Sequence, residues 1–412
     1  MGTQTWWALD SAPSLKISRL SHRTVQPIET EARLKQCAGN IPITRVADLT
    51  PLDPLRLPVF SATTPMAIDL TTHLGKGLDA CSARVSAMTE ALERHCAEFT
   101  TRPVLKMSYL EMTRAGHHTA DPHNFELPAD SGYRDTQSIS WVEGRDLLQD
   151  KSVWIALDLV LSPPTERVLL DVDTNGLAAG NTHLEAIVHG LCEVIERDSL
   201  GQHLFVEMFG AAGESGALIR NIDLTTLPDT AKALREHIEE TGQSLDITCV
   251  TTEIGVPVFR TVLVDHAYPR GGSFDTRRFL GFGASPNSEV GLLRSMTEAV
   301  QSRVAVVQGA RDSFNSLSAS ARFIKPQAML NDFQRGYQTD FNEIATFSTE
   351  DLQEDMHFLG QALRNAGIES IIAVNLSREE PMMPVVRVRV PGLSSFLGNR
   401  RRLGWRCLRH LL

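Results

Sequence analysis

Three segments of the chain combine apolar positions at helical spacing with glutamates or a glutamine three residues apart. They read S-A-M-T-E-A-L-E-R at 86–94, H-G-L-C-E-V-I-E-R at 189–197 and R-S-M-T-E-A-V-Q-S-R at 294–303. Residues three apart on a helix share a face, so each segment points two polar side chains the same way, beside apolar neighbours. The pattern predicts three such helices, over about 80–99, 182–208 and 288–310.

Other stretches have the alternation and β-branched content of strands. The predicted strands cover 41–50, 57–62, 152–161, 167–172, 246–254, 257–265, 371–376 and 384–391. Shorter helices are expected to begin near Pro27 and to cover about 229–242 and 350–366. Because several strands follow one another through short turns, we expect an α+β fold with antiparallel or mixed sheets rather than a doubly wound parallel sheet.

Local signals mark the ends of these elements. Thr182 and Glu185 have the spacing of a capping box before the second glutamate helix, and Asn287 or Ser288 is expected to cap the third. The glycines of Gly75-Lys76-Gly77 predict a turn just before the first. Loops are expected at 115–136 and 210–216, with a hairpin at 269–273 and a variable segment at 312–348.

Composition narrows the class of protein. The chain has 412 residues, of which 42% are hydrophobic and 22% charged, as in ordinary soluble globular proteins. No run approaches the roughly 18 apolar residues that span a membrane, and the first residues do not read as a signal peptide. The net charge of −10 argues against a generally nucleic-acid-binding surface. The six cysteines form no C-x-x-C pair, so we expect reduced thiols in a cytoplasmic protein and no structural zinc.

The repeated glutamates carry the candidate chemistry. Five recur in matched positions, and Gln301 takes the place that a sixth would fill; the five are Glu90, Glu93, Glu193, Glu196 and Glu298. Carboxylates beside a buried face repel one another and lose hydration, so they need a counter-charge.

Two counter-charges are available. One is arginine, because Arg94 lies four residues after Glu90 and Arg197 four after Glu193. For any single helix this is the commoner arrangement. The other is a divalent cation: Mg²⁺ binds few carboxylates, keeps several waters and takes phosphates as further ligands.

Three similar helices in one chain favour the second interpretation, a nucleotide–magnesium site. Lys76, just before the first glutamate helix, is then available for phosphate. The chain has no Walker A motif, and a lone G-K-G more often marks an ordinary exposed turn.

In this order and spacing the motifs resemble those of the YcaO family of ATP-dependent enzymes. The pattern S-x-x-x-E-x-x-E-R matches 86–94, N-G-x-A-x-G-N-T followed by E-x-x-E-R matches 175–182 and 193–197, and E-x-x-Q-x-R matches 298–303. The resemblance covers roughly 28–395, which we expect to be a YcaO-like catalytic domain after an N-terminal extension, 1–27. It implies that ATP is bound by Lys76, Ser86, Arg94, Arg197, Gln301 and Arg303, and Mg²⁺ by the five glutamates.

The family chemistry is activation of a peptide backbone amide. A sulfur, oxygen or nitrogen nucleophile adds to the carbonyl carbon, ATP phosphorylates the amide oxygen, and phosphate leaves. Sulfide gives a thioamide, whereas a neighbouring Cys, Ser or Thr gives a thiazoline or oxazoline. The resemblance implies a ribosomal precursor peptide as substrate, a TfuA-like or E1-like partner protein and a homodimer. A non-catalytic peptide-docking subunit is a further alternative, against which the intact motif positions argue.

The chain departs from the family pattern at three places. These departures bear on which branch of the family it resembles and on which residue is the catalytic base. The chain ends L-R-H-L-L instead of in a P-x-P-x-P tail, Thr64-Pro65 replaces Arg-Pro, and a histidine common before the third helix is replaced near Ser285. The missing proline tail favours the thioamide-forming, TfuA-associated branch and leaves the catalytic base open.

The tail 396–412 is basic. Its arginines are Arg400, Arg401, Arg402, Arg406 and Arg409. We expect a solvated end, with contact to a partner or peptide as the alternative.

Overall fold

The computed structural model describes residues 13–37, 40–169, 172–209, 219–266, 278–309, 337–378 and 383–412. The predicted loop at 210–216, the hairpin at 269–273 and most of the variable segment at 312–348 lie outside the described residues.

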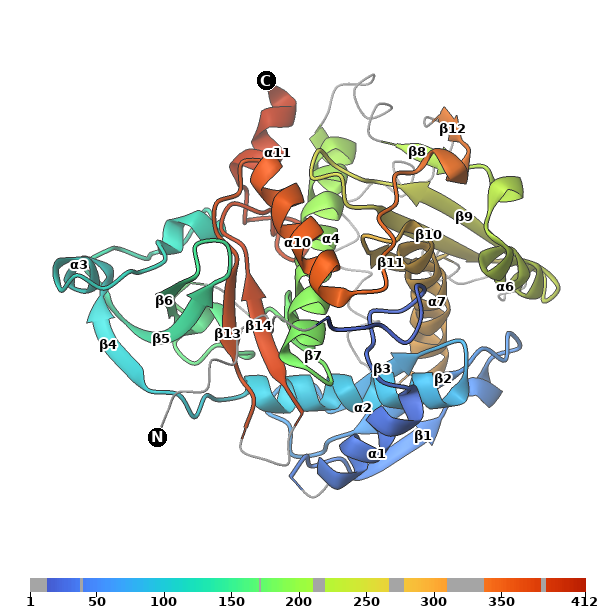
Figure 1. Cartoon of the computed structure of the whole chain (residues 1–412), viewed down its shortest axis with the longest axis horizontal. Helices are drawn as coiled ribbons and strands as arrows, with labels where there is room; N and C mark the ends of the chain where they lie inside the picture. The colour runs from blue at the N-terminus through green and yellow to red at the C-terminus, as the bar shows by residue number, and fades with distance from the viewer. Residues whose placement is uncertain are drawn as a thin grey trace.

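The described strands form three sheets (Figure 1). The first is antiparallel, with β1 (Arg45–Asp48), β2 (Val59–Thr63) and β3 (Thr72–Lys76) in that order. The second has the order β11-β10-β9-β8-β12, from β8 (Arg220–Ile222), β9 (Gln243–Cys249), β10 (Val258–Asp265), β11 (Arg278–Ala284) and β12 (Tyr337–Thr339).

The third sheet has the order β4-β5-β13-β14-β7, and β6 also pairs with β5. Its strands are β4 (Val104–Ser108), β5 (Ser138–Asp146), β6 (Lys151–Ala156), β7 (Leu177–Ala179), β13 (Ile372–Asn375) and β14 (Val385–Arg389). All its ladders are antiparallel, whereas β8 and β12 of the second sheet pair in parallel. The expected α+β fold with antiparallel and mixed sheets is confirmed.

Each predicted glutamate helix is present. They are α2 (Ala80–Ala97), α4 (His183–Phe209) and α7 (Ser288–Gln308). In Figure 1, α2 lies beside the first sheet, α4 runs through the middle of the molecule, and α7 packs on β10 and β11. The three helices therefore join the three sheets.

The helix caps follow the sequence closely. Asn287 accepts from the backbone N–H of Glu289 at 2.9 Å and caps α7. Thr182 Oγ1 accepts from Glu185 N at 3.1 Å, the predicted half of the capping box. The other half differs, because the Glu185 carboxylate accepts from Asn181 N at 2.7 Å instead of from the Thr182 N–H.

Two glycines let strands lie directly against the glutamate helices. A Cβ on Gly75 would lie 2.0 Å from Ala87 N of α2, and one on Gly281 would lie 2.1 Å from Ser295 O of α7. The prediction of a turn at Gly75-Lys76-Gly77 is wrong, because Gly75 and Lys76 are the last two residues of strand β3. Gly75 is required for close backbone packing and not for a turn.

The predicted strand at 167–172 is also wrong, since residues 167–169 are not in a strand. The buried Asp158 carboxylate accepts from the backbone N–H groups there, at 2.7 Å from Val168 and 3.3 Å from Leu169. A side chain thus supplies the partners that a neighbouring strand would supply. The predicted strand at 152–161 ends at Ala156, and Leu157–Leu159 is a 3₁₀ turn.

The expected shorter helices are α1 (Pro27–Cys37), α6 (Asp229–Glu239) and α10 (Leu352–Asn365). Two more, α3 (Tyr109–Arg114) and α11 (Trp405–Leu408), were not expected. Apolar side chains gather in separate cores, one under β4–β6 and α2, one between α4, α10 and β14, and one between α6, α7 and β9–β11. All six cysteines are free thiols, as expected.

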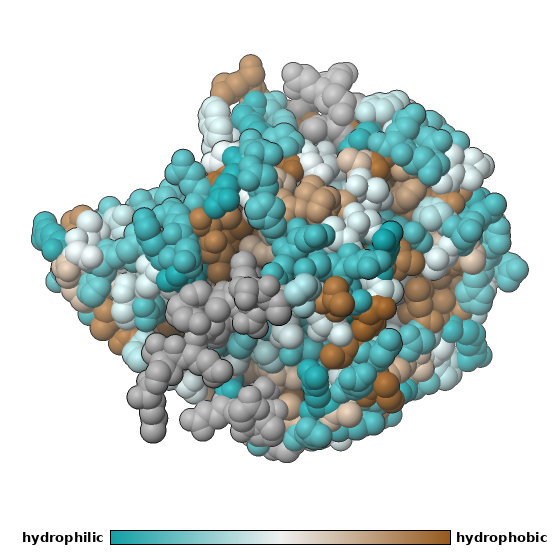
Figure 2. Space-filling view, viewed as in Figure 1, coloured by the Kyte–Doolittle hydropathy of each residue, from teal (hydrophilic) through white to brown (hydrophobic). Residues whose placement is uncertain are grey.

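Polar residues cover most of the face shown in Figure 2, with apolar residues in separate patches. Among the described residues, no helix is long and apolar enough to cross a bilayer.

The expectation of a solvated C-terminal end is only partly right, because two of its arginines are buried against the fold while others are exposed. Arg406 is 5% exposed and forms a two-armed ion pair with Asp198 of α4, at 2.7 Å for both contacts. Arg402 is equally buried and donates to the carbonyl oxygens of Phe125 and Glu126. A carboxylate as buried as Asp198 needs a paired cation, and the tail provides it.

We predict that Arg406→Ala destabilises the protein by about 3–5 kcal/mol, because it leaves Asp198 buried and unpaired. The matched control is Arg401→Ala, which removes an exposed ion pair to Asp130 and costs at most about 1 kcal/mol. Chemical denaturation of both variants measures the difference. Equal, small effects would mean that the tail does not contribute to folding stability.

Candidate nucleotide and metal site

One face of each glutamate helix carries the candidate residues at helical spacing. On α2 these are Ser86, Glu90 and Glu93; on α4 they are Glu185, His189, Glu193 and Glu196; on α7 they are Arg294, Glu298 and Gln301. The hydrogen bonds and ion pairs of these side chains show that the three faces meet.

Strand β3 joins α2 to α7 through a single residue. The Leu74 N–H donates to Glu90 Oε2 at 3.2 Å, and the Leu74 carbonyl accepts from Gln301 Nε2 at 3.0 Å. Two residues further along β3, Lys76 forms a short ion pair with Glu298. The sequence-predicted Lys76, Glu90, Glu298 and Gln301 are therefore brought together.

Glu93 joins α2 to the strand that leads into α4. Its Oε1 accepts from the N–H of Ala179, in β7, at 2.7 Å. The pKa of Glu93 is raised from 4.5 to about 8, first by loss of solvent around the carboxyl and then by the negative charges of Glu90 and Glu193, while the Ala179 hydrogen bond acts to lower it. Glu93 therefore has carboxylates of α2 and α4 near enough to affect its pKa, and no cation in the described residues offsets them fully.

On α4, Arg197 lies between two glutamates, 3.8 Å from Glu193 Oε1 and 3.8 Å from Glu196 Oε1. At that distance these are ion pairs without hydrogen bonds. Burial still raises the pKa of Glu193, and it raises that of Glu196 to about 7. Arg197 therefore compensates only part of the cost of placing two carboxylates here.

Glu298 differs from Glu93, Glu193 and Glu196 in the direction of its pKa shift. Burial acts to raise its pKa, but the Lys76 ammonium and the Arg197 guanidinium together hold the pKa below its usual value. Glu298 therefore stays ionised beside the protonatable Glu196.

Sequence reasoning missed Arg294 as a member of this site. Its Nη1 donates to Nδ1 of His189 at 3.0 Å, and its charge acts on the pKa values of Glu196 and Glu298. Burial, followed by the charge of Arg294, holds the pKa of His189 far below its usual range, so this imidazole is neutral. The available signal was the spacing, because Arg294 lies one turn before Glu298 on the same face.

Two predicted nucleotide ligands lie at the edge of the site. Arg94 contacts Glu90 at 3.4 Å and Asp69 at 3.1 Å. Ser86 is half-buried on α2, one turn before Glu90.

Arg303 is engaged elsewhere. It forms buried ion pairs with Asp53 and with Asp265, the latter at 2.8 Å. The structure does not bring Arg303 together with the glutamates, so its contact with ATP stays a prediction.

The carboxylates fit a hard divalent cation by chemistry. Among the described residues, no group of three or more His, Cys, Asp or Glu is arranged to hold a metal ion, and Lys76 and Arg197 lie against the glutamates instead. The donors are all oxygen, the type that Mg²⁺ prefers, and burial raises the pKa values of three of the carboxyl groups, Glu93, Glu193 and Glu196.

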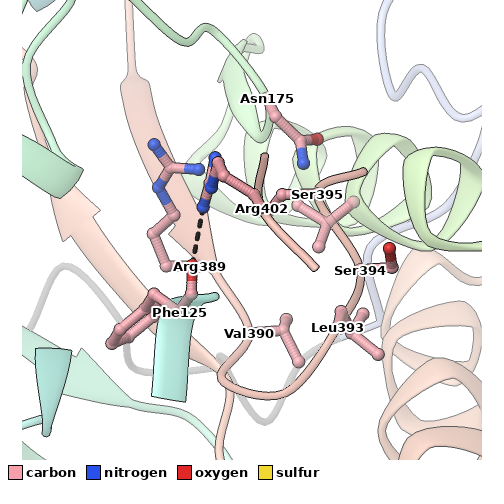
Figure 3. Close-up of a pocket in the computed structure, with 9 residues that line it drawn as sticks. Phe125, Asn175, Arg389, Val390, Leu393, Ser394, Ser395 and Arg402 are labelled. Atoms are coloured by element: carbon pink, nitrogen blue, oxygen red, sulfur yellow. Dashed lines mark hydrogen bonds between the residues drawn. The ribbon is translucent and has the colours of Figure 1, made fainter. Parts of the chain in front are cut away.

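A separate small cavity lies beside the C-terminal segment (Figure 3). It has about 20 Å³ of space, enough for one or two water-sized atoms. Arg402 and Arg389 lie side by side at its wall, and Arg402 Nη2 donates to the Phe125 carbonyl at 2.7 Å. None of the predicted site residues lines this cavity.

Comparison with known proteins shows the family to which the chain belongs. Residues 74–394 match the model of a family described as YcaO cyclodehydratase, ATP- and Mg²⁺-binding. An uncharacterized protein encoded in the tfuA 3′ region of Rhizobium leguminosarum bv. trifolii is 31% identical over 411 residues, covering 96% of this chain and 94% of that protein.

Two solved structures share the fold. YcaO from Methanopyrus kandleri bound with AMPPCP and Mg²⁺ has a TM-score of 0.73 at 24% identity, over 93% of this chain and 95% of that chain. A heterocyclase in complex with substrate and cofactor has a TM-score of 0.76 at 21% identity, over 94% of this chain and 54% of that chain. The chain belongs to the YcaO family, whose members are ATP- and Mg²⁺-dependent enzymes.

The raised pKa of Glu93 predicts how the metal-free protein responds to pH. In the unfolded chain this carboxyl ionises near 4.5, and in the folded protein near 8, so the unfolded state binds fewer protons between these values. The free energy of unfolding should therefore fall as pH rises from about 4.5 to about 8.

Glu93→Gln should flatten that pH profile and raise stability at pH 8 in the absence of Mg²⁺ and nucleotide. The control is Glu350→Gln, at an exposed ion pair. Thermal unfolding across the pH range measures the effect. A profile for Glu93→Gln that keeps the wild-type slope would show that Glu93 ionises normally in the folded protein.

Proposed function

We propose that this protein uses ATP and Mg²⁺ to activate a backbone amide of a ribosomally made peptide, and that the product is a thioamide. Sulfide adds to the carbonyl carbon, and the amide oxygen takes the γ-phosphoryl group as ADP leaves. The C–O bond then breaks with loss of phosphate. The proposal of a thioamide product rests on one observation. A relative encoded in the tfuA 3′ region matches this chain over nearly its full length.

Bound Mg²⁺–ATP supplies the phosphoryl group that makes the amide oxygen a leaving group, which is chemistry that the side chains alone do not offer. Glu90, Glu93, Glu193, Glu196 and Glu298 are proposed to hold the cations. For Glu298, this requires that Lys76 move from the carboxylate to phosphate. Arg197, between Glu193 and Glu196, is placed to keep both carboxylates oriented.

Lys76, Ser86, Arg94, Arg197, Gln301 and Arg303 remain the proposed nucleotide ligands. Of these, Gln301 is already held by the backbone of β3, so its amide is fixed before a ligand arrives. We propose the catalytic unit as 28–395, in a cytoplasmic homodimer that works with a TfuA-like partner.

A second candidate is cyclodehydration of Cys, Ser or Thr to an azoline with an E1-like or other peptide-docking partner. The family description and the structural likeness to a heterocyclase favour it. Both candidates use the same activation step and differ only in the nucleophile. A peptide-docking subunit without catalysis is the third candidate. The glutamates of the three helices argue against it, because keeping carboxylates together at a buried site is unfavourable unless they bind a cation.

We predict that Glu90→Ala and Glu196→Ala each lower turnover roughly a hundredfold or more, because each removes a carboxylate that would hold the cation, and the cation would neutralise the charge of the transferred phosphoryl group. The matched control is Glu236→Ala on the exposed face of α6, which should retain wild-type turnover. Mass spectrometry of a candidate peptide with ATP and sulfide measures turnover, and circular dichroism checks the fold. Retained activity in both site variants would reject the metal role.

The product distinguishes the two reactions. For a thioamide, the peptide mass should rise by the exchange of one oxygen for one sulfur, and only when a sulfur source is present, either free sulfide or sulfide donated through the TfuA-like partner. For an azoline, the mass should fall by one water without sulfide. Loss of water from a peptide in the absence of any sulfur source would contradict the proposed function and leave the activation step intact.

A further inference from the structure

Three arginines share one carboxylate beside the small cavity of Figure 3. Arg387 and Arg389 are two residues apart on β14 and so point to the same face of the sheet, and Arg402 reaches the same place from the C-terminal segment. All three pair with Asp173, at 4.0 Å, 2.9 Å and 3.3 Å respectively. Each arginine is at most 5% exposed, so three buried cations face one directly paired anion.

The carboxyl groups nearby do not supply the missing negative charge. The buried Asp198 is taken by Arg406, which pairs with both of its oxygens. Glu126 accepts from the Ser395 N–H at 2.7 Å, but loss of solvent raises its pKa to about 7. At neutral pH Glu126 therefore carries only part of a negative charge, and the arginine cluster keeps an excess of positive charge.

The cluster also has donors left over. Arg389 Nε donates to the Leu159 carbonyl at 2.6 Å, and its Nη1 donates to Asp173 at 2.9 Å. Its Nη2 is buried and has no acceptor among the described residues, and the same holds for Nε and Nη1 of Arg387. A buried, charged N–H group without an acceptor is costly, so these atoms indicate a ligand with acceptor character.

The cavity restricts that ligand to something very small. Its volume of about 20 Å³ holds one or two water-sized atoms, so a tetrahedral oxyanion such as phosphate does not fit. Arg389, Arg402 and the amide of Asn175 supply polar groups at the wall, and the rest is largely apolar, with Val390 and Leu393 (Figure 3). A water molecule would accept hydrogen bonds here but would leave the positive charge uncompensated.

We propose that this cavity is a binding site for one monatomic, monovalent anion of the chloride class, held by Arg389 and Arg402. The anion would join β14 and the C-terminal segment to the 3₁₀ turn at Pro122–Phe125, whose last carbonyl Arg402 already holds. None of the residues predicted to bind nucleotide or Mg²⁺ lines the cavity. The inference is therefore independent of the proposed function.

The test is thermal unfolding of the full chain, without Mg²⁺ or nucleotide, while sodium chloride replaces sodium gluconate at constant ionic strength. Gluconate has the same charge as chloride but is too large for the cavity. The thermal midpoint should rise with chloride and then level off, by about 3 °C once chloride is about a hundredfold above its Kd. Bromide should act in the same way.

Two variants separate the site from a general effect of salt. Arg389→Gln removes the charge and the spare donors, so its midpoint should be the same in chloride and in gluconate. Val390→Ile keeps every charge but adds a methylene group at the cavity wall, so it should also lose the increment. The matched control is Arg401→Gln in the C-terminal segment, which removes an exposed pair to Asp130 and should keep the full wild-type increment.

Equal midpoints of the wild type in chloride and gluconate would overturn the inference, and would mean that the cavity holds water. An increment that persists unchanged in Arg389→Gln and Val390→Ile would also overturn it, because it would then be a general effect of the salt. Each comparison is made within one protein, so a lower stability of a variant does not affect it. If Arg389→Gln does not fold, Val390→Ile decides between the same outcomes.

Discussion

The organising constraint of this structure is electrostatic. Three helices that also build the hydrophobic cores bring carboxylates to one place, where burial raises the pKa values of Glu93, Glu193 and Glu196. Arg197 and Lys76 offset only part of this cost. A fold that needed only stability would gain by replacing such groups with apolar residues. Their presence is explained if a divalent cation and phosphates complete the charge balance.

The scaffold explains how the carboxylates stay in register. Strands β3 and β11 lie so close to α2 and α7 that only glycine fits at Gly75 and Gly281. Leu74, next to Gly75, then uses its own N–H and carbonyl to hold Glu90 and Gln301. Close packing of strand on helix and placement of the site are therefore consequences of the same few residues.

Much of this arrangement was predictable from the sequence. The helical spacing of apolar and acidic residues predicted all three glutamate helices and the α+β class, because periodicity is a local property. The convergence of Lys76, Glu298 and Gln301 was predictable only through the repetition of the motif, and Arg294 could have been added from its position one turn before Glu298.

The features that the sequence did not predict depend on hydrogen bonds and ion pairs to residues outside the local pattern. The segment at 167–169 has strand-like composition, but Asp158 takes its N–H groups. The basic composition of the tail predicts a solvated end, but Arg406 forms an ion pair with the buried Asp198. Arg303 follows the family motif, yet it pairs with Asp53 and Asp265. Hydrogen bonds and ion pairs that the local sequence pattern does not reveal decided each of these cases.

The central claim is that the glutamate helices form a magnesium-dependent nucleotide site. The most direct measurement is calorimetric titration of the wild type and of Glu193→Ala with an ATP analogue, with and without Mg²⁺. The account predicts binding by the wild type that requires Mg²⁺ and is lost or strongly weakened in Glu193→Ala. Nucleotide binding that is indifferent to Mg²⁺, or unchanged in Glu193→Ala, would contradict it.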